Sequence, residues 1–259
     1  MHPLSNLSQQ GLLEWGDIIA VSPATFQQIQ AIAMSSEKPG HNPYRNAAYI
    51  ISAHKLAQLP GDKGIEVAFA GRSNAGKSSA INALTEQNAL ARTSKTPGRT
   101  QQIVIFDIDQ ERRIADLPGY GYAKVPAKLR AHWKQVLQRY FATRESLRGV
   151  VLVMDIRHPL RPFDQQMITW CEHSGVSCHV LLTKSDKLKR GPAQATLLQV
   201  NQSLPPGATA QTFSATKGQG KAELISRLNE WYELVANDTG SPECPAPDKI
   251  RSRTTGTSP

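Results

Sequence analysis

Short apolar runs alternate with longer segments of helical periodicity through the middle of the chain. Six of the runs predict β-strands, and helical patterns follow most of them: Glu66–Gly71, Ile103–Ile108, Arg113–Asp116, Gly149–Asp155, His179–Thr183 and Ala210–Ser214. Strands that are apolar throughout suit a sheet covered by helices on both faces. The pattern therefore predicts a doubly wound α/β fold with a six-stranded, mostly parallel sheet.

One pair of strands departs from the parallel arrangement. Between Ile103 and Asp116, a turn at Asp109, Gln110 and Glu111 leaves no room for a crossover helix. This pair must be antiparallel, so we expect one antiparallel strand in the sheet.

The two ends of the chain differ from its middle. Residues 1–42 are of middling polarity, with one amphipathic helical pattern at Pro23–Met34. From Asp238 onward the chain is rich in Pro, Ser, Thr and Gly, a composition that cannot offset its ordering entropy. We therefore expect an N-terminal extension at 1–42, one globular domain at 43–237 and a disordered tail at 238–259.

Composition and charge narrow the range of partners. The 30 basic residues outnumber the 21 acidic ones, which gives a net charge of +9 and favours a polyanionic partner such as RNA, although many basic proteins bind no nucleic acid. Cys171, Cys178 and Cys244 lack the spacing of a disulfide framework or metal site, which favours a reducing compartment. No stretch approaches the roughly 18 apolar residues of a membrane span, and the N-terminus does not resemble a signal peptide. We expect a cytoplasmic, soluble protein that does not bind membranes.

A glycine-rich segment after the first predicted strand matches the phosphate-binding pattern GxxxxGK[ST]. Its residues are Gly71, Arg72, Ser73, Asn74, Ala75, Gly76, Lys77 and Ser78. Backbone N–H groups of such a loop surround a phosphate, the lysine reaches the β- and γ-phosphates, and the serine hydroxyl binds Mg²⁺. The alternative is an ordinary Gly-rich turn, which the strand before and the helix after it disfavour. The loop alone does not identify the base.

Two later motifs follow the fifth and sixth predicted strands, where an open α/β sheet binds ligands. They consist of Thr183, Lys184, Ser185 and Asp186, and of Ser214, Ala215 and Thr216. The Asp186 carboxylate can accept hydrogen bonds from N1–H and the 2-amino group of guanine, whereas adenine would leave it unpaired. The Lys184 stem can cover the purine, and the Ala215 N–H can donate to O6. The combination predicts a guanine nucleotide, GTP or GDP.

Two further segments predict a switch. The third strand ends in Asp116, Leu117, Pro118 and Gly119, where the carboxylate can hold Mg²⁺ through water and the Gly119 N–H can contact the γ-phosphate. The second segment precedes the second strand and supplies Gly98, Arg99, Thr100, Gln101 and Gln102. Thr100 is the expected second hydroxyl on Mg²⁺, although a loop hydroxyl can also cap a turn. Lys77, Thr100 and Gly119 are the expected catalytic residues.

The residues of these motifs resemble those of the EngB family, bacterial GTPases implicated in large-ribosomal-subunit assembly and in normal division and septation. The resemblance spans residues 43–235 and rests on GRSNAGKSS, TSKTPGRTQ, DLPGYGYA, MDIRHPL and LLTKSDKL. It implies a Ras-like P-loop fold, Mg²⁺-dependent GTP binding, and association with large-subunit precursors and their rRNA. We expect a monomer.

Two positions depart from the pattern of many GTPases. Tyr120 stands where a glutamine often orients the attacking water, so we expect slow hydrolysis that the ribosome or a monovalent cation completes. Asn74 resembles a K⁺-coordinating asparagine of related GTPases, although its turn conformation alone can explain it. Thr183 replaces the usual asparagine, but the family resemblance itself carries threonine here.

Alternative functions remain open. Basic residues on the predicted helix after DLPGYGYA, among them Lys128 and Lys134, are either a solvated surface or a nucleotide-gated rRNA contact. Asp155, Arg157, His158 and Asp164 suggest acid–base chemistry, but a salt-bridged, capped loop is favoured. Besides a ribosome-assembly GTPase, we consider a nucleotide-dependent scaffold for division proteins and a P-loop kinase or ATPase, which the two base-reading motifs disfavour.

Overall fold

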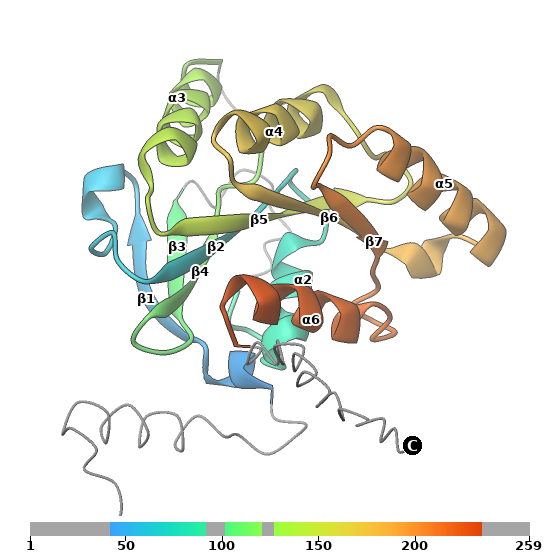
Figure 1. The fold of residues 1–259 in the computed structure, drawn as a ribbon, viewed down its shortest axis with the longest axis horizontal. Helices are drawn as coiled ribbons and strands as arrows, with labels where there is room; N and C mark the ends of the chain where they lie inside the picture. The colour runs from blue at the N-terminus through green and yellow to red at the C-terminus, as the bar shows by residue number, and fades with distance from the viewer. Residues whose placement is uncertain (1–41, 92–101, 121–126, 235–259) are drawn as a thin grey trace, which may run out of the picture. The chain divides into compact units, whose positions relative to one another are not determined.

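A seven-stranded sheet with helices on both faces forms the body of the molecule (Figure 1). The computed structural model describes residues 42–91, 102–120 and 127–234. The strands are β1 Ala48–Ala53, β2 Ile65–Gly71, β3 Ile103–Asp107, β4 Arg112–Asp116, β5 Leu147–Asp155, β6 Ser177–Thr183 and β7 Thr209–Thr212. The helices are α2 Lys77–Thr85, α3 Ala127–Thr143, α4 Pro162–His173, α5 Arg190–Gln202 and α6 Lys221–Trp231, with short 3-10 turns at Pro43–Asn46, Leu56–Gln58 and Ser185–Lys187.

The strand order is β1-β3-β4-β2-β5-β6-β7. Strand β3 is antiparallel to both of its neighbours, β1 and β4, and the other pairings are parallel. Only β3 therefore runs against the rest of the sheet, which confirms the prediction of one antiparallel strand. Asp109 explains the tight β3–β4 turn, because its Oδ1 accepts hydrogen bonds from the backbone N–H of Glu111 and Arg112, each at 2.9 Å.

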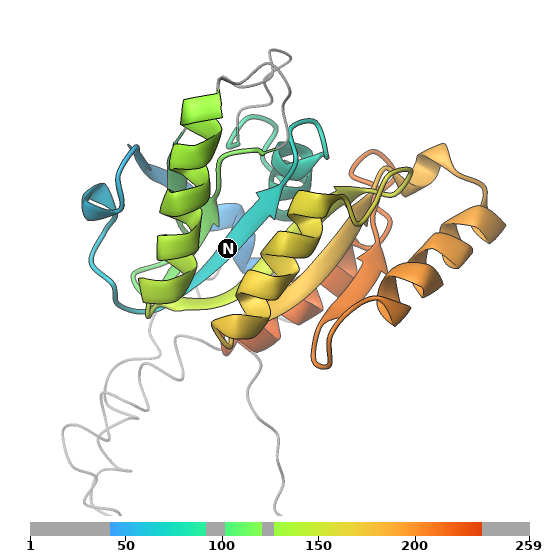
Figure 2. The same ribbon diagram turned by 90° about the horizontal axis from the view of Figure 1, so that it is seen from above.

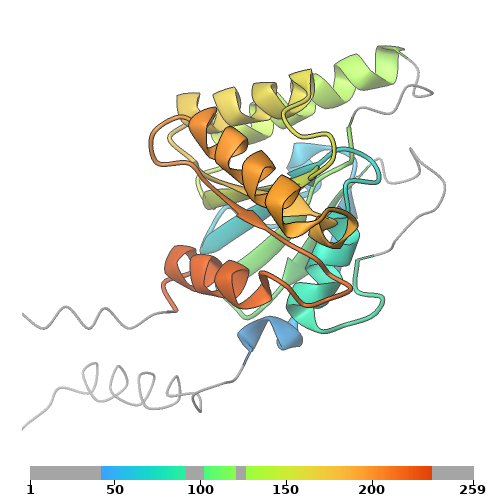
Figure 3. The same cartoon turned by 90° about the vertical axis from the view of Figure 1, so that its right-hand side faces the viewer.

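Two apolar layers explain why the central strands lack alternation. Ala68 and Ala70 of β2 pack with α3, α4 and α5 on one face, whereas Val67 and Phe69 pack with α2 and α6 on the other. Figures 2 and 3 show the two helical layers from above and from the side. Because both side-chain directions are buried, every position of a central strand can be apolar.

The six predicted strands are confirmed to within two residues at each end, but the predicted count of six is too low. Sequence reasoning missed β1, an edge strand whose side chains are largely exposed, with Tyr49 58% and Ile50 44% exposed. Backbone pairing with β3 forms this strand, with an irregularity between Tyr49 and Ile51. A strand held mainly by its backbone leaves little hydrophobic pattern to detect.

A buried ion pair ties α3 to the strand that carries the phosphate loop. Glu66 of β2 accepts hydrogen bonds from Arg144 Nη2 at 2.9 Å and from the Tyr140 hydroxyl at 2.5 Å. Glu66 and Tyr140 are fully buried, and the Arg144 side chain is 8% exposed. Breaking such a pair would leave a buried charge without a partner, which is costly. The ion pair therefore fixes the end of α3 against the start of β2.

Several predictions fall on residues that the structure does not describe. They are the helix at Pro23–Met34, the tail from Asp238, and Cys244. The domain boundaries at 42/43 and 237/238 also stay predictions. Cys171 and Cys178 are buried free thiols, as the spacing of the cysteines indicates. None of the helices that the structure describes has both the length and the apolar run needed to cross a bilayer.

Candidate functional site

The phosphate loop connects the end of β2 to the start of α2. Gly76 precedes α2 with φ 102°, and Asn74 also lies in the left-handed region with φ 64°. Asparagine tolerates this conformation better than most residues, which accounts for Asn74 without reference to an ion. Coordination of K⁺ by Asn74 stays a prediction.

The lysine of the loop faces the carboxylate of the DLPG motif. Lys77 Nζ forms an ion pair with Asp116 Oδ1, and both side chains are buried. Lys77 begins helix α2, and Ser78, the next residue of that helix, is partly exposed. Hydroxyl and carboxylate oxygens are the ligands that Mg²⁺ prefers, so the residues at this point of the site fit that ion.

The DLPG turn lies directly against the phosphate loop. A Cβ built on Gly119 would be 3.1 Å from Ser73 Oγ and 3.3 Å from Ser73 N. The backbone N–H of Leu117 donates to the Phe69 carbonyl at 3.0 Å, and the Ser73 N–H donates to the Tyr120 carbonyl at 2.9 Å. Glycine at position 119 is thus explained by close approach of the two loops.

Thr183 joins the base-reading loop to the phosphate loop. Its hydroxyl lies within hydrogen-bond distance of the Ala75 carbonyl and, at 3.0 Å, of the Met154 carbonyl. The side chain is almost fully buried, 3% exposed. The threonine that replaces the usual asparagine therefore makes a side-chain contact to the phosphate loop.

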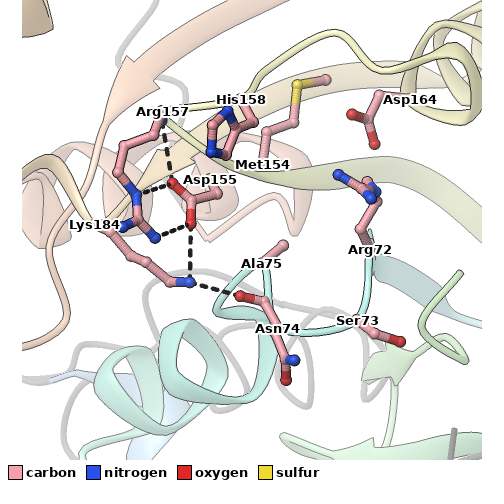
Figure 4. Close-up of a pocket in the computed structure, with 10 residues that line it drawn as sticks. All are labelled: Arg72, Ser73, Asn74, Ala75, Met154, Asp155, Arg157, His158, Asp164 and Lys184. Atoms are coloured by element: carbon pink, nitrogen blue, oxygen red, sulfur yellow. Dashed lines mark hydrogen bonds and ion pairs between the residues drawn. The ribbon is translucent and has the colours of Figure 1, made fainter. Parts of the chain in front are cut away.

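Lys184 is held over the phosphate loop by two partners. Its Nζ donates to the Asn74 carbonyl at 2.6 Å and to Asp155 Oδ2 at 2.9 Å, and Asp155 also accepts from Arg157 Nη2 at 2.7 Å (Figure 4). Burial opposes ionisation of Asp155, but the hydrogen bonds from Arg157 and Lys184 outweigh it and hold its pKa below the ordinary value. Asp155 thus keeps a full negative charge beneath the Lys184 ammonium.

The two predicted base-reading motifs meet at Asp186. The Ser214 hydroxyl donates to Asp186 Oδ1 at 2.7 Å, and this bond lowers the pKa of Asp186. Neighbouring bonds fix the loops, since Ser185 N–H donates to the Phe213 carbonyl at 3.1 Å and the Ser185 hydroxyl to Gln219 Oε1 at 3.1 Å. Ala215 and Thr216 continue the same loop. The result is an ionised carboxylate, an acceptor only, in a preformed frame.

Of the predicted residues in the segment 98–102 before β3, the structure describes Gln102 alone. Gly98, Arg99, Thr100 and Gln101 lie outside the described residues. The Gln102 side chain lies 2.5 Å from His54 Nε2, after β1.

Two residues of α4 hold the Tyr120 side chain. Its hydroxyl donates to Asp164 Oδ1 at 2.7 Å, and its ring stacks on Phe163 with centroids 4.4 Å apart. Asp164 Oδ2 also accepts from the Arg161 N–H at 2.9 Å, where it caps α4. In this arrangement the Tyr120 hydroxyl proton is committed to Asp164. The capped, salt-bridged loop favoured for Asp155 and Asp164 is confirmed.

A cavity of about 240 Å³ borders these groups. Its walls include Arg72, Ser73 and Asn74 of the phosphate loop, together with Asp155 and Lys184 (Figure 4). The sequence had not assigned Asp155 to the site, although its place at the end of β5, next to the phosphate-loop strand, could have indicated it.

Comparison with known proteins decides the family. A family model described as "50S ribosome-binding GTPase" matches residues 66–184. A probable GTP-binding protein EngB of Xanthomonas oryzae pv. oryzae is 57% identical over 194 residues, which cover 73% of this chain and 94% of that protein. This chain belongs to the EngB family. A second EngB protein, from Xanthomonas euvesicatoria pv. vesicatoria, is 55% identical over 199 residues, covering 75% of this chain and 96% of that protein.

Solved structures agree with this EngB assignment at the level of the fold. A crystal structure of a probable GTP-binding protein engB has a TM-score of 0.55 at 24% identity, covering 65% of this chain and 98% of that one. Era of Aquifex aeolicus has a TM-score of 0.54 at 22% identity, covering 65% and 57%. This EngB family member is a GTPase with a Ras-like P-loop fold.

Proposed function

We propose that this chain is a slow, Mg²⁺-dependent GTPase switch that acts in assembly of the large ribosomal subunit, and that normal division and septation depend on it. The observation that carries the nucleotide assignment is the junction of Ser214 with Asp186, next to the Thr183 and Lys184 contacts to the phosphate loop. These contacts support a site in which the Asp186 carboxylate accepts from guanine while the phosphate loop binds the phosphates.

The described residues have distinct roles in this proposal. Backbone N–H groups of residues 73–78 and the Lys77 ammonium bind the phosphates, and the Asp186 carboxylate accepts from N1–H and the 2-amino group of guanine. Ser78, Thr100 and, through water, Asp116 would hold Mg²⁺, which neutralises phosphate charge when bound. The Gly119 N–H contacts the γ-phosphate. When nucleotide binds, Lys77 would exchange its contact with Asp116 for the phosphates, and Asp116 would turn to the metal. This exchange links nucleotide binding to the DLPG turn.

The position of Tyr120 supports slow intrinsic hydrolysis. With its hydroxyl bonded to Asp164, no glutamine-like group at this position orients the attacking water. A stabilising group supplied by a partner can raise such rates by roughly 10³- to 10⁵-fold. The ribosomal particle would supply this group. Turnover compared in KCl and NaCl separately tests the predicted role of K⁺ at Asn74.

Nucleotide competition tests the site itself. Displacement of labelled GDP is expected with excess GTP but not with ATP or XTP. In an Asp186→Asn variant the preference should shift toward xanthine, because the amide can donate to a carbonyl at position 2. Displacement of labelled GDP from the wild type by ATP would instead favour a kinase or ATPase.

Ribosomal association separates the two remaining functions. The family model's description and the net charge of +9 support a ribosomal partner, and Lys134 and Arg139 of α3 are exposed. Cosedimentation with large-subunit precursors is expected for the GTP-loaded chain and weaker for the GDP-loaded one. Charge reversal at Lys128 and Lys134 should weaken it without changing GTP affinity. If neither the GTP-loaded nor the GDP-loaded chain bound the precursors, a scaffold for division proteins would be favoured.

A further inference from the structure

Charge is distributed unevenly between the two edges of the sheet. The carboxyl-edge rim, which we define as the loops at 155–161, 184–190 and 214–220, carries seven lysines and arginines and two aspartates. The segments at the opposite edge carry two basic and four acidic residues: 59–64, 108–111, 144–146, 174–176 and 203–208. The excess positive charge of the sheet loops therefore lies on the side of the phosphate loop.

Both aspartates of the rim already have partners. Asp155 binds Arg157 and Lys184, and Asp186 accepts from Ser214 and lies 3.4 Å from Lys187 Nζ. Four exposed cations of the rim make no ion pair with any carboxylate in the part of the chain that the structure describes: Arg161, Lys189, Arg190 and Lys217.

Two of these cations stand where the fold disfavours positive charge. Helix α5 begins at Arg190, Lys189 precedes it, and no acidic residue lies in the first turn. The positive end of the helix dipole repels both side chains, and a bound polyanion would remove that penalty. A bound external anion explains the placement of Lys189 and Arg190 better than a contribution to the stability of the fold does.

The rim is a preformed frame rather than separate loops. Ile156 N–H donates to the Thr183 carbonyl at 3.0 Å, which joins the first loop to the second. Ser185 joins the second to the third through Phe213 and Gln219. Strands β5, β6 and β7 are neighbours in the sheet (Figure 1). Because adjacent strands lie roughly 4.8 Å apart, their loops present one continuous row of charge.

We propose that the carboxyl-edge rim binds the phosphate backbone of RNA equally in the GDP-bound and GTP-bound chain. The choice of RNA rests on the proposed ribosomal function. None of the rim loops includes the DLPG turn or residues 98–102, the segments expected to respond to the γ-phosphate. The rim would be a constitutive anchor, whereas α3, which follows the DLPG turn, would be the nucleotide-gated contact.

A matched pair of charge-reversal variants of the full chain tests the proposal. The rim variant is Lys189→Glu/Arg190→Glu, which also places acids at the start of α5, where they favour the helix. The control is Lys63→Glu/Arg148→Glu at the opposite edge, with the same change of net charge. Arg148 pairs with Glu233 at 3.2 Å, but both side chains are more than half exposed, so little stability is lost.

The measurement is fluorescence anisotropy with a labelled 30-nucleotide single-stranded RNA, over a series of KCl concentrations, with GDP or a non-hydrolysable GTP analogue. The rim variant should bind about 10-fold more weakly at 100 mM KCl in both nucleotide states, with a salt slope smaller by about 1.4, as expected for two lost phosphate contacts. The control should bind more tightly than the rim variant in both states.

Three results would overturn the assignment. The first is a rim variant that binds the RNA no more weakly than the control does, and the second is a loss of RNA affinity confined to one nucleotide state. The third is a rim variant with unchanged RNA binding but lost binding to phosphatidylglycerol vesicles, which would assign the rim to a membrane. The proposed ribosomal function fails differently, because wild type itself would then bind neither the RNA nor large-subunit precursors in either nucleotide state.

Discussion

Substitution of Asp155 by asparagine tests whether the site depends on a residue outside the base-reading motif. The carboxylate accepts from Lys184 Nζ at 2.9 Å and from Arg157 Nη2 at 2.7 Å, and its own side chain is 16% exposed. Asp155→Asn removes the charge and leaves a single amide oxygen to accept. Lys184 would keep its bond to the Asn74 carbonyl but lose its counter-ion.

The size of the effect follows from the exposure of the pair. A hydrogen bond to a charged group contributes about 1.5–3 kcal/mol, and solvent access to Lys184, which is 32% exposed, reduces this to about 1 kcal/mol. If that stabilisation is needed to hold Lys184 over the purine, the GDP dissociation constant should rise about fivefold. Because the pKa of Asp155 is held below 3.8, the difference in stability should be full above pH 4 and shrink as the pH falls further.

Displacement of a fluorescent GDP analogue measures the affinity, and urea unfolding measures the stability. Asp107→Asn is the matched control, since Asp107 pairs with Arg113 Nε at 3.1 Å, has a side chain that is 33% exposed, and lies at the end of β3 away from the phosphate loop. It should lose comparable stability and keep GDP affinity. An Asp155→Asn affinity within twofold of wild type, with the stability loss present, would refute a role for Asp155 in positioning Lys184.

Three further variants test other contacts. Thr183→Val removes the hydroxyl that bonds the Ala75 and Met154 carbonyls, so the GDP dissociation constant should rise about 10-fold while Thr183→Asn stays near wild type; equal affinities of the two variants, by calorimetry, would contradict the bridge. Tyr120→Phe should cost about 1–2 kcal/mol in urea unfolding yet leave GTP turnover within twofold, because the hydroxyl bonds Asp164; a turnover loss beyond 10-fold would place that hydroxyl in hydrolysis. Burial lowers the pKa of His179 from 6.5 to about 4, so the folded state favours the neutral ring. The contribution of this ring to the free energy of unfolding is complete above pH 6.5 and declines by about 1.4 kcal/mol per pH unit toward pH 4. His179→Gln should flatten the pH profile of stability in that window, and an unchanged profile would show that another group is responsible.

The order of elements and the main motifs are properties of consecutive residues, so the sequence determined them. The runs around Val67 and Val151 are apolar throughout because both faces of a central strand are covered, and this pattern is visible without any knowledge of partners. The phosphate loop, the DLPG turn and the base-reading motifs were likewise recognised because each is a local segment at a strand end. The guanine preference followed from their order.

Contacts between segments far apart in the chain were decided only by the tertiary structure. Strand β1 exists because its backbone pairs with β3, and its exposed side chains carry no pattern. The pairing of Asp155 with Lys184 spans 29 residues, and that of Tyr120 with Asp164 spans 44. Hydrogen-bond partners of buried polar groups depend on which loops the sheet brings side by side. A carboxylate after a strand can therefore be recognised in the sequence, but the cation or hydroxyl that it holds is known only once the chain has folded.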